Sequence, residues 1–397
     1  MFFVLQILHI LAWIGSVTSS IYCLMVLLAA IRFRTRHPQS SGPVKRPTPS
    51  VSVLKPLHGM QPGLHKNLAS HFVQDYPGEF ELLFCARQGQ DEGLLLARTL
   101  ADLHPKVKCQ FLLSGEPLFP NAKAYSLNLM ADAASHELLV TTDADVCVGS
   151  DYLTTCVAEF EQKNADLASC LYRGVAEGSS LAVRLDAIGK TVEMSSGALV
   201  AAMLNGVDFA LGPSMIFTRR AISDVGGFRE LGDYWAEDFV FGNRLAARGR
   251  KVELSTYVVE LVVSAKGAWD SFANQLRWMQ STRRSRKWGH LGTGLTFAVP
   301  YGLLGLIDEI CLGNIWVGMF LLSIAIFNRV VQCSAVATLL RDKNVLSSSL
   351  LYPVRDLLGA VLWFCSYLPL PTLYHETALH ILPDGRLERS PRLQQSA

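Results

Sequence analysis

Two acidic residues stand two positions apart at Asp143-Ala144-Asp145, directly after the apolar run Leu138–Val140. Carboxylates with this spacing at the end of a buried strand can supply oxygen ligands to a hard divalent cation. Magnesium or manganese held in this way keeps open positions for diphosphate oxygens. A bare D-x-D also occurs in ordinary turns, but its position behind a strand favours a metal site with Asp143 and Asp145 as ligands.

A second acidic pair, Glu237-Asp238, precedes an amphipathic helical pattern over Phe239–Arg248 that Gly249 ends. Acidic residues at the start of a helix have a structural explanation, because they complement the helix dipole. They also have a chemical one, since a carboxylate can act as a general base toward an acceptor hydroxyl. The pattern by itself leaves both explanations open.

The third candidate is Asn274-Gln275-Leu276-Arg277-Trp278, followed by further basic residues over 283–287. Arginine presents planar donors suited to a diphosphate, and a neighbouring aromatic ring can form a wall against a sugar or an acceptor. The basic residues over 283–287 are instead typical of a juxtamembrane belt. We therefore take Arg277 and Trp278 as the functional pair.

The segment that must position these residues alternates short apolar, strand-like runs with helical patterns. Nearly continuous apolar strands alternating with helices indicate a parallel sheet covered on both faces, with ligands beyond the carboxyl ends of the strands. The sequence thus predicts an α/β domain. Its expected strands are Val51–Leu57, Phe80–Arg87, Lys106–Leu113, Glu137–Thr142 and Asp166–Leu171, with helices near 64–74, 92–103, 122–135 and 150–162.

Membrane segments are expected on both sides of this domain. Residues 3–31 contain no Asp, Glu, Lys or Arg, and this uncharged run is long enough to cross a bilayer. Arg32, Arg34 and Arg36 follow directly after it. Positive flanks mark the cytoplasmic end of a span, so the domain after them should be cytosolic. The expected divisions are an anchor with its basic flank (1–36), a linker (37–50), the catalytic domain (51–290), a C-terminal membrane region (291–372) and a tail (373–397).

Composition agrees with a membrane enzyme. Half of the 397 residues are hydrophobic and the net charge is only +2, so a nucleic-acid partner has no overall electrostatic support. The nine cysteines form no C-x-x-C pair, and the ten histidines show no paired ligand spacing. Within the C-terminal region, Asp308, Glu309 and Arg329 interrupt apolar runs, and such groups should face a protein interior or a water-filled cavity.

These motifs, in their order along the chain, resemble those of ceramide glucosyltransferases and their bacterial relatives in hopanoid lipid synthesis, within the large inverting family that has a GT-A fold. The likeness runs from about residue 50 to 290. Its segments are Leu54-Lys55-Pro56-Leu57-His58-Gly59, Asp75-Tyr76-Pro77, Glu81–Cys85, Asn121-Ala122-Lys123, the Asp143 turn, Gly212-Pro213-Ser214, Ala236-Glu237-Asp238, Arg248-Gly249 and Arg277-Trp278.

The resemblance implies a GT-A (Rossmann-like, mostly parallel) catalytic domain and a role for each matching residue. Asp238 matches the catalytic base, and Arg277 and Trp278 match the end of the (Q/R)-x-x-R-W motif near acceptor and diphosphate. Asp143 matches the aspartate near donor and metal, with Asp145 as a further ligand. The implied donor-binding residues are Pro56, Asp91, Lys123, Asp143 and Glu237, with Asp91 contacting the uridine.

Three departures from the family pattern concern specificity. Asn274 stands where the motif has Gln or Arg, Gln88 replaces an aspartate, and a second acid, Asp145, accompanies Asp143. They favour a bacterial relative and leave the sugar and the lipid open.

The expected activity is transfer of a hexose, glucose or N-acetylglucosamine, from a UDP-sugar to a lipid hydroxyl of ceramide or hopanoid type, with Mg²⁺ or Mn²⁺ as cofactor. The expected location is a multi-pass membrane protein of the bacterial cytoplasmic membrane, with the eukaryotic Golgi or endoplasmic reticulum as alternatives. A processive polysaccharide synthase and a non-catalytic membrane scaffold or transporter are the other functions left open.

Overall fold

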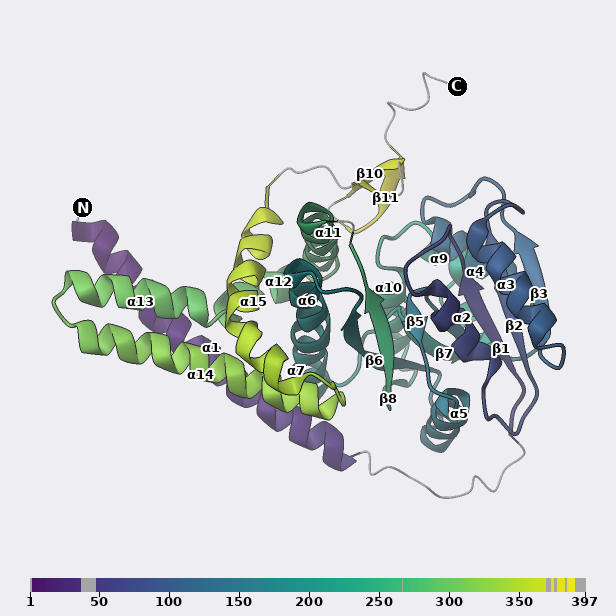
Figure 1. Ribbon diagram of the computed structural model, residues 1–397, viewed down its shortest axis with the longest axis horizontal. Coiled ribbons are helices and arrows are strands. Elements are labelled where there is room, and N and C mark those ends of the chain that lie inside the picture. The colour runs from purple at the N-terminus through teal and green to yellow at the C-terminus, as the bar shows by residue number, and fades with distance from the viewer. Residues whose placement is uncertain are drawn as a thin grey trace. The chain divides into compact units, whose positions relative to one another are not determined.

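The computed structural model describes residues 2–36, 48–265, 267–368, 373–374, 377–382 and 384–389. Most of the linker predicted at 37–50 therefore lies outside the described residues. The chain forms two compact units, each assembled from distant segments (Figure 1). The helical unit holds Met1–Pro38, Gly178–Leu204 and Ala265–Leu370, and the sheet unit holds Gln39–Glu177, Asn205–Ser264 and Pro371–Ala397.

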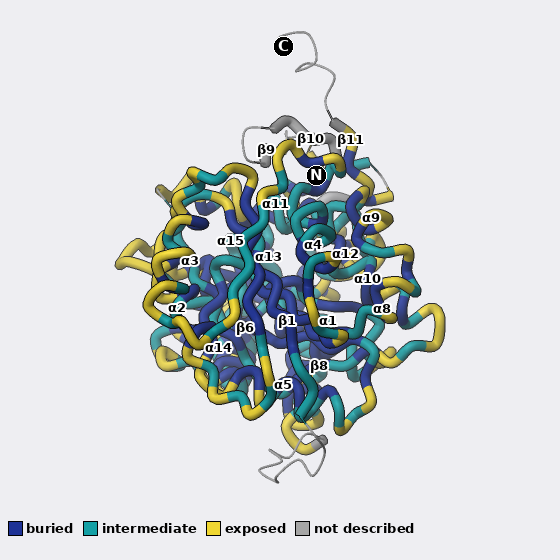
Figure 2. The backbone as a smooth tube through the Cα atoms, turned by 90° about the vertical axis from the view of Figure 1, so that its right-hand side faces the viewer, coloured by how far each residue is buried: buried dark blue, intermediate teal, exposed yellow. Residues whose placement is uncertain are grey.

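An eight-stranded sheet with the order β3-β2-β1-β4-β7-β6-β8-β5 is the centre of the sheet unit. Strand β1 is buried along almost its whole length (Figure 2). The strands are β1 (Val51–Pro56), β2 (Phe80–Ala86), β3 (Lys108–Leu113), β4 (Leu138–Thr142), β5 (Val146–Cys147), β6 (Leu167–Ala176), β7 (Ser214–Thr218) and β8 (Val252–Val263).

The first half of the sheet is parallel, as the alternating pattern predicts. Ladders β3–β2, β2–β1 and β1–β4 are all parallel. Because parallel strands need a helical crossover, each is followed by a helix, and these helices lie close to their predicted positions. They are α2 (Leu64–Phe72), α3 (Glu92–Leu103), α4 (Ala122–Ala133) and, after β5, α5 (Tyr152–Lys163).

The second half makes the sheet mixed rather than parallel throughout. Strand β7 pairs antiparallel with both β4 and β6, and β5 pairs antiparallel with β8, while β6 and β8 are parallel. Helices α8 (Arg219–Asp224), α9 (Gly227–Leu231) and α10 (Glu237–Ala247) follow β7. Together with α4 they bury one apolar core against the sheet, which includes Leu54, Leu127, Met130, Leu139, Phe217, Phe228, Phe241 and Leu245.

A small three-stranded sheet near the C-terminus also belongs to the sheet unit. It consists of β9 (Leu373–Tyr374), β10 (Thr377–Ile381) and β11 (Leu387–Arg389), in the order β11-β10-β9 with antiparallel ladders.

Among the described residues, the helical unit contains three helices that are long and apolar enough to cross a membrane: α1 (Phe2–Arg36), α14 (Ile315–Leu339) and α15 (Val345–Cys365). A bent pair of helices would count as a fourth if it forms one span. The bent pair joins α12 and η2 to α13 at an angle of 48°. The helical elements of the whole unit are α1 (Phe2–Arg36), α6 (Leu181–Ile188), η1 (Gly189–Met194), α7 (Ser195–Asn205), α11 (Ala268–Ser285), α12 (Lys287–Thr293), η2 (Gly294–Thr296), α13 (Val299–Cys311), α14 (Ile315–Leu339) and α15 (Val345–Cys365).

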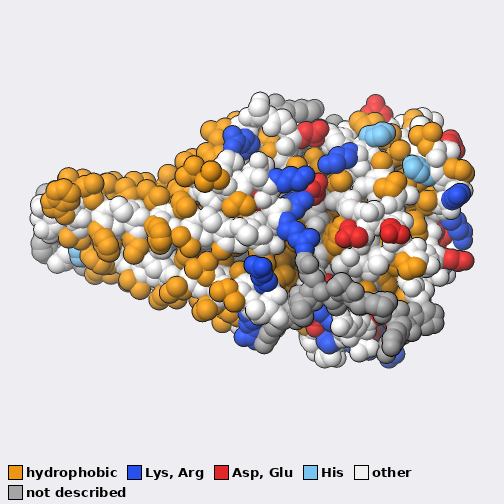
Figure 3. Space-filling view, turned by 60° about the horizontal axis from the view of Figure 1, so that its bottom comes forward, with side chains coloured by type: hydrophobic (Ala, Val, Ile, Leu, Met, Phe, Trp, Pro, Cys, Tyr) orange, Lys and Arg blue, Asp and Glu red, His pale blue; other side chains and the backbone are white. Residues whose placement is uncertain are grey.

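Large apolar side chains of α1, α13 and α14 are exposed, and hydrophobic side chains cover much of the narrow end of the molecule in Figure 3. Arg329, Asp308 and Glu309 are at most 6% exposed. Arg329 Nε lies 2.9 Å from Asp356 Oδ1, and Asp356 Oδ2 also accepts hydrogen bonds from the first amides of α13. The ionisable residues within the apolar segments thus face the protein interior, as expected from the cost of exposing charge to lipid.

Candidate active site

The carboxyl ends of β2, β1 and β4 meet at one edge of the sheet, where the strand order changes direction. The chain moves outward from β1 to β2 and β3 and then returns to the other side of β1 as β4. In open α/β sheets ligands bind at this switch point. Lys55 near the end of β1 and Asp143 just after β4 therefore lie where a ligand is expected to bind.

The turn that carries Asp143 and Asp145 is held by hydrogen bonds along its backbone. The amide of Asp143 donates to Pro213 O (3.1 Å), Lys55 Nζ donates to Asp143 O (3.0 Å), and Asn67 Nδ2 donates to Ala144 O (3.2 Å). Val262 N donates to Asp145 O (2.8 Å). Because these bonds use main-chain atoms, the two carboxylates project from a fixed turn.

Lys55 itself is completely buried, which the sequence did not reveal. Its ammonium group also donates to Thr142 Oγ1 (3.0 Å). Burial lowers the pKa of Lys55 to about 7, although Asp143 and Asp145 act in the opposite direction. Lys55 thus supports the Asp143 turn from within the sheet.

Lys123, in the first turn of α4, connects two of the acidic motifs. Its Nζ lies 2.6 Å from Asp143 Oδ1 and 3.1 Å from Glu237 Oε1. Burial by itself would lower the pKa of this ammonium, but the carboxylates of Asp143, Glu237 and Asp238 outweigh it and hold the pKa well above its usual value. Residues 123, 143 and 237 therefore form one ionic cluster.

Asp238 lies next to this cluster, on the first turn of α10. Its Oδ2 accepts a hydrogen bond from Gly212 N (2.6 Å), and its Oδ1 accepts one from Phe239 N (2.8 Å). Burial raises the pKa of Asp238 to about 6, Glu237 adds to this rise, and Lys123 opposes it. A carboxylate whose pKa is near neutrality is suited to general-base chemistry.

Asn121 contacts the ionic cluster but is not among the site residues predicted from the sequence. It caps α4 by accepting a hydrogen bond from Ala124 N (3.1 Å), and its Nδ2 donates to Glu237 Oε2 (3.0 Å) and Tyr234 O (3.0 Å). An asparagine directly before a helical run signals an N-cap. That local signal could have indicated its capping role, whereas its contact with the distant Glu237 depends on tertiary structure.

Asp91 and Pro56 lie at the same edge of the sheet, outside the ionic cluster. Pro56 ends β1, and Asp91 follows β2 as the N-cap of α3. Both carboxylate oxygens of Asp91 accept backbone hydrogen bonds, from Gly59 N (2.7 Å) and Leu94 N (3.1 Å). Asp91 thus has a structural role, and its predicted contact with uridine stays a prediction.

Arg277 and Trp278 lie on α11, in the helical unit. Lys190 Nζ sits 5.1 Å from the centre of the Trp278 ring, a cation–π distance. One turn earlier, Gln275 is buried, and its Oε1 accepts from Arg355 Nη1 at 2.5 Å. Asn274 occupies the first position of the motif, and its neighbour Gln275 connects α11 to α15 through this hydrogen bond.

The oxygen ligands of Asp143 and Asp145 fit a hard cation such as Mg²⁺ or Mn²⁺ by their chemistry and by the rigid turn that carries them. The ammonium of Lys123 lies 2.6 Å from Asp143 Oδ1, so this carboxylate already faces a positive charge. Within the described residues, one compact group of three metal-binding side chains is found elsewhere, in the helical unit, and comprises His9, Asp308 and Glu309.

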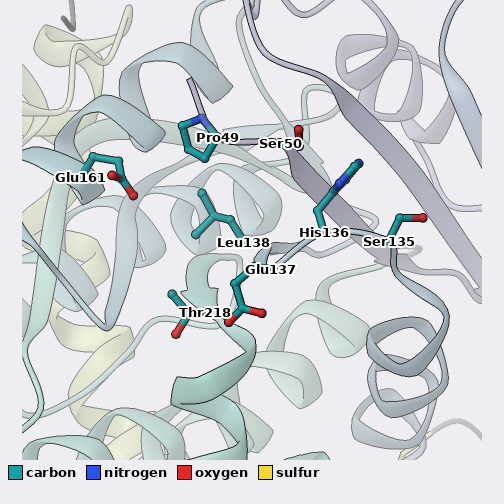
Figure 4. Close-up of a pocket in the computed structure, with 8 residues that line it drawn as sticks. All are labelled: Pro49, Ser50, Ser135, His136, Glu137, Leu138, Glu161 and Thr218. Carbon is teal, nitrogen blue, oxygen red and sulfur yellow. The ribbon is translucent and has the colours of Figure 1, made fainter. Parts of the chain in front are cut away.

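A shallow surface pocket lies at the opposite edge of the sheet, where β1 and β4 begin (Figure 4). It contains none of the predicted site residues, so we do not connect it with catalysis. Its lining residues are Pro49, Ser50, Ser135, His136, Glu137, Leu138, Glu161 and Thr218.

The sequence profile of the family described as Glycosyl transferase family 21 matches residues 11–387. The chain belongs to this family. One similar curated protein is Ceramide glucosyltransferase 1 of Caenorhabditis elegans. Its sequence is 28% identical to this chain, over 70% of this chain and 55% of the relative. Ceramide glucosyltransferase 3 of the same organism is 28% identical over 70% of this chain and 60% of the relative. The chain thus spans a little over half the length of these relatives.

The fold of this family 21 chain is similar to a solved mannosyltransferase from Pyrobaculum calidifontis, in complex with GDP-Man and Mn²⁺. The likeness covers 90% of this chain and 100% of the other, with a TM-score of 0.51 and 19% sequence identity. The predicted ceramide glucosyltransferase-like family and GT-A fold class, with apolar helices on either side of the catalytic fold, are both confirmed.

Proposed function

We propose that this family 21 protein is an inverting hexosyltransferase that moves glucose or N-acetylglucosamine from a UDP-sugar to the hydroxyl of a membrane lipid. The acceptor would be of ceramide or hopanoid type. Family membership and the two relatives named ceramide glucosyltransferase support the reaction class. The observation that carries the proposal is the carboxylate of Asp238, with a pKa of about 6, beside the ionic cluster at the switch point of the sheet.

In the proposed reaction, Asp238 takes the proton of the acceptor hydroxyl. The acceptor oxygen forms a bond to the anomeric carbon as the bond from that carbon to the diphosphate oxygen breaks, and UDP leaves with the electron pair. A single displacement inverts the anomeric centre, so an α-linked donor gives a β-glycoside. The hydrogen bond from Gly212 N holds one oxygen of Asp238 in place for this step.

Positive charge beside the donor would stabilise the leaving diphosphate. Lys123 supplies it in the sheet unit, where it stays protonated because of its acidic neighbours. Arg277 and Trp278 are the proposed contacts for the acceptor and diphosphate, as their match to the family motif implies. Pro56, Asp91 and Glu237 are proposed to line the donor site.

Asp143 and Asp145 would hold a divalent cation, Mg²⁺ or Mn²⁺. When bound, such an ion neutralises charge on the diphosphate of the donor. The hydrogen-bonded backbone of the Asp143 turn supports this assignment because it holds the main chain that carries both ligands in place.

The membrane placement of the proposed enzyme follows from its helices and charges. Arg32, Arg34 and Arg36 follow the apolar part of α1, which supports a cytosolic sheet unit. A multi-pass protein of the bacterial cytoplasmic membrane is the preferred location, with the Golgi or endoplasmic reticulum as the eukaryotic alternative. An acceptor lipid would then reach the enzyme without leaving the bilayer.

The test is an assay of the full chain, purified in detergent, with UDP-glucose or UDP-N-acetylglucosamine and with ceramide or a hopanoid bearing a hydroxyl. A β-linked monoglycosyl lipid is expected, and Asp238→Asn should lower turnover by roughly 100- to 10,000-fold. The matched control is Asp102→Asn, an exposed acid on α3. A growing polysaccharide in place of a monoglycosyl lipid, or full activity of Asp238→Asn, would contradict the proposal.

A further inference from the structure

The chain returns to the sheet unit after its last long helix and pairs with the loop that leads into Glu237-Asp238. Leu387 N donates to Asp233 O (2.7 Å), and Trp235 N donates to Gly385 O (3.1 Å). These bonds form an antiparallel bridge centred on Tyr234 and Arg386. A segment some 150 positions later in the chain thus fixes the backbone directly before the proposed base.

Side chains strengthen the same junction. The Tyr234 ring has the guanidinium of Arg244 at 5.2 Å and that of Arg386 at 5.7 Å from its centre. Both arginines also donate to the Tyr234 hydroxyl, Arg244 Nη2 at 3.3 Å and Arg386 Nε at 3.4 Å. Tyr234 is therefore held by one cation from α10 and one from the C-terminal segment.

This junction is connected to the ionic cluster through Asn121. Its Nδ2 donates both to the carbonyl of Tyr234 and to Oε2 of Glu237, and Glu237 in turn pairs with Lys123. A displacement of Tyr234 would therefore be transmitted to Glu237 within two hydrogen bonds.

Helix α10 has a particular need for external support at this end. Its N-cap is Ala236, which has no side chain able to accept a hydrogen bond from the first amides of the helix. The position of the first turn, which carries Glu237 and Asp238, consequently depends on how the loop before it is fixed. The C-terminal segment supplies that fixation by main-chain pairing.

The C-terminal segment is shaped for this contact by its own turn. Gly385 has a φ of +84°, in the left-handed region that favours glycine, and its amide donates to Leu382 O (2.9 Å). Leu382 N donates to Arg386 O (2.8 Å), which closes the turn between β10 and β11. Leu387 is buried at 7% exposure, so the hairpin is packed as well as hydrogen-bonded.

We propose that residues 384–387, called here the C-terminal clasp, position the Glu237-Asp238 turn for catalysis. The clasp acts through Tyr234 and Asn121 and has no chemical role of its own, so Arg386 and Leu387 are positioning residues. The catalytic part of this inference rests on the proposed function, whereas the pairing of the clasp with the loop does not.

The clasp also constrains the membrane topology. Since it shares a unit with residues 205–264, both must lie on one side of the bilayer, so the stretch between them, 265–370, crosses an even number of times. Epitopes inserted within 37–50 and after Ala397 should accordingly be accessible from the same face. Accessibility from opposite faces would overturn the proposal.

The experiment compares four variants of the full chain in detergent. Leu387→Pro removes the amide that donates to Asp233 O, Arg386→Ala removes one of the two cations at Tyr234, and Arg386→Lys restores a charge there. Glu388→Ala, exposed and adjacent, is the matched control. Hydrogen exchange of the amides of residues 233–237 should be faster in Leu387→Pro and unchanged in Glu388→Ala.

Kinetics then test the catalytic part. Leu387→Pro should lose up to about 100-fold in kcat, because the turn that carries the base is misplaced. The donor KM should change less, because Pro56 and Asp91 lie outside the ionic cluster that the clasp reaches through Glu237. Arg386→Ala should lose less, and Arg386→Lys should recover most of the loss. Unchanged exchange in Leu387→Pro would overturn the pairing, and faster exchange with unchanged kcat would overturn the positioning role. A parent protein without transferase activity would instead refute the proposed function, with the exchange result still valid.

Discussion

The amide of Gly212 donates to Asp238 Oδ2 over 2.6 Å, and a Cβ atom on Gly212 would lie 2.6 Å from that same oxygen. Gly212 lies in the turn before β7, and Asp238 lies in the first turn of α10, 26 positions later in the chain. The absence of a side chain at 212 is what allows the backbone to approach the proposed base so closely.

The first prediction concerns this approach. Gly212→Ala should displace the Asp238 carboxylate and lower kcat by about 100-fold, because small misplacements of a catalytic group are costly. Gly197→Ala is the control, since a Cβ atom there meets no atom within 4 Å. Steady-state kinetics with UDP-sugar measure the effect. Equal rates for the two variants would show that Asp238 does not need its present position.

The second prediction concerns pH. Only ionised Asp238 can accept a proton, so kcat/KM should rise with pH through the pKa of about 6 and level off above it. Lys123 lowers that pKa, so Lys123→Met should move the rise to higher pH, whereas Lys123→Arg should move it less. A pH–rate profile of each variant gives the answer. A profile of Lys123→Met shifted to lower pH would contradict the assigned charges.

The third prediction concerns metal binding. Removal of the cation with a chelator should abolish transfer, and Mn²⁺ should restore it. Asp143→Ala and Asp145→Asn should weaken Mn²⁺ binding in the presence of UDP, measured by electron paramagnetic resonance. Asp132→Asn, an acid on the exposed side of α4, should bind as the parent does. Undiminished Mn²⁺ binding by both turn variants would remove Asp143 and Asp145 from the ligand set.

The fourth prediction concerns the ion pair between the buried Arg355 and the partly buried Glu193 in the helical unit. Arg355 Nη2 lies 2.7 Å from Glu193 Oε2, and the Arg355 guanidinium packs so closely on Gly189 that a Cβ there would lie 2.4 Å from Nε. Arg355→Met should destabilise the protein by about 1–3 kcal/mol, because it leaves the partly buried carboxylate of Glu193 and the buried amide oxygen of Gln275 without their shared partner. Adding Glu193→Gln should recover part of that loss.

Thermal unfolding in detergent measures both variants of this pair. A double variant less stable than Arg355→Met alone would contradict the electrostatic explanation. Because Arg355 also donates to Gln275 on α11, the double variant should keep a reduced turnover even where stability returns.

Much of the first half of the fold was predictable from local sequence. The apolar runs of β1, β2, β3 and β4 and the helices between them lie within a few residues of their predicted positions. These signals are local: strands show as apolar runs, and N-caps such as Asp91 and Asn121 mark helix starts. The sequence order of the acidic motifs also predicted the family, which the profile match confirms.

The roles assigned to single residues stay predictions, because they depend on substrates. The structure brings Lys123, Asp143, Glu237 and Asp238 together, as the proposed reaction requires. Asp91 lies at the same edge of the sheet, and Arg277 and Trp278 lie in the helical unit.

Tertiary structure alone decided which distant groups meet. Nothing near Lys123 in the sequence indicates that its ammonium bridges Asp143 and Glu237, and nothing near residue 385 indicates a partner at residue 235. Strand direction at β7, the burial of Lys55 and the return of the C-terminal clasp all depend on pairings between segments far apart in the chain. Local periodicity and capping determine where elements begin and end, but the partner of each element is selected by burial and hydrogen bonding over the whole fold.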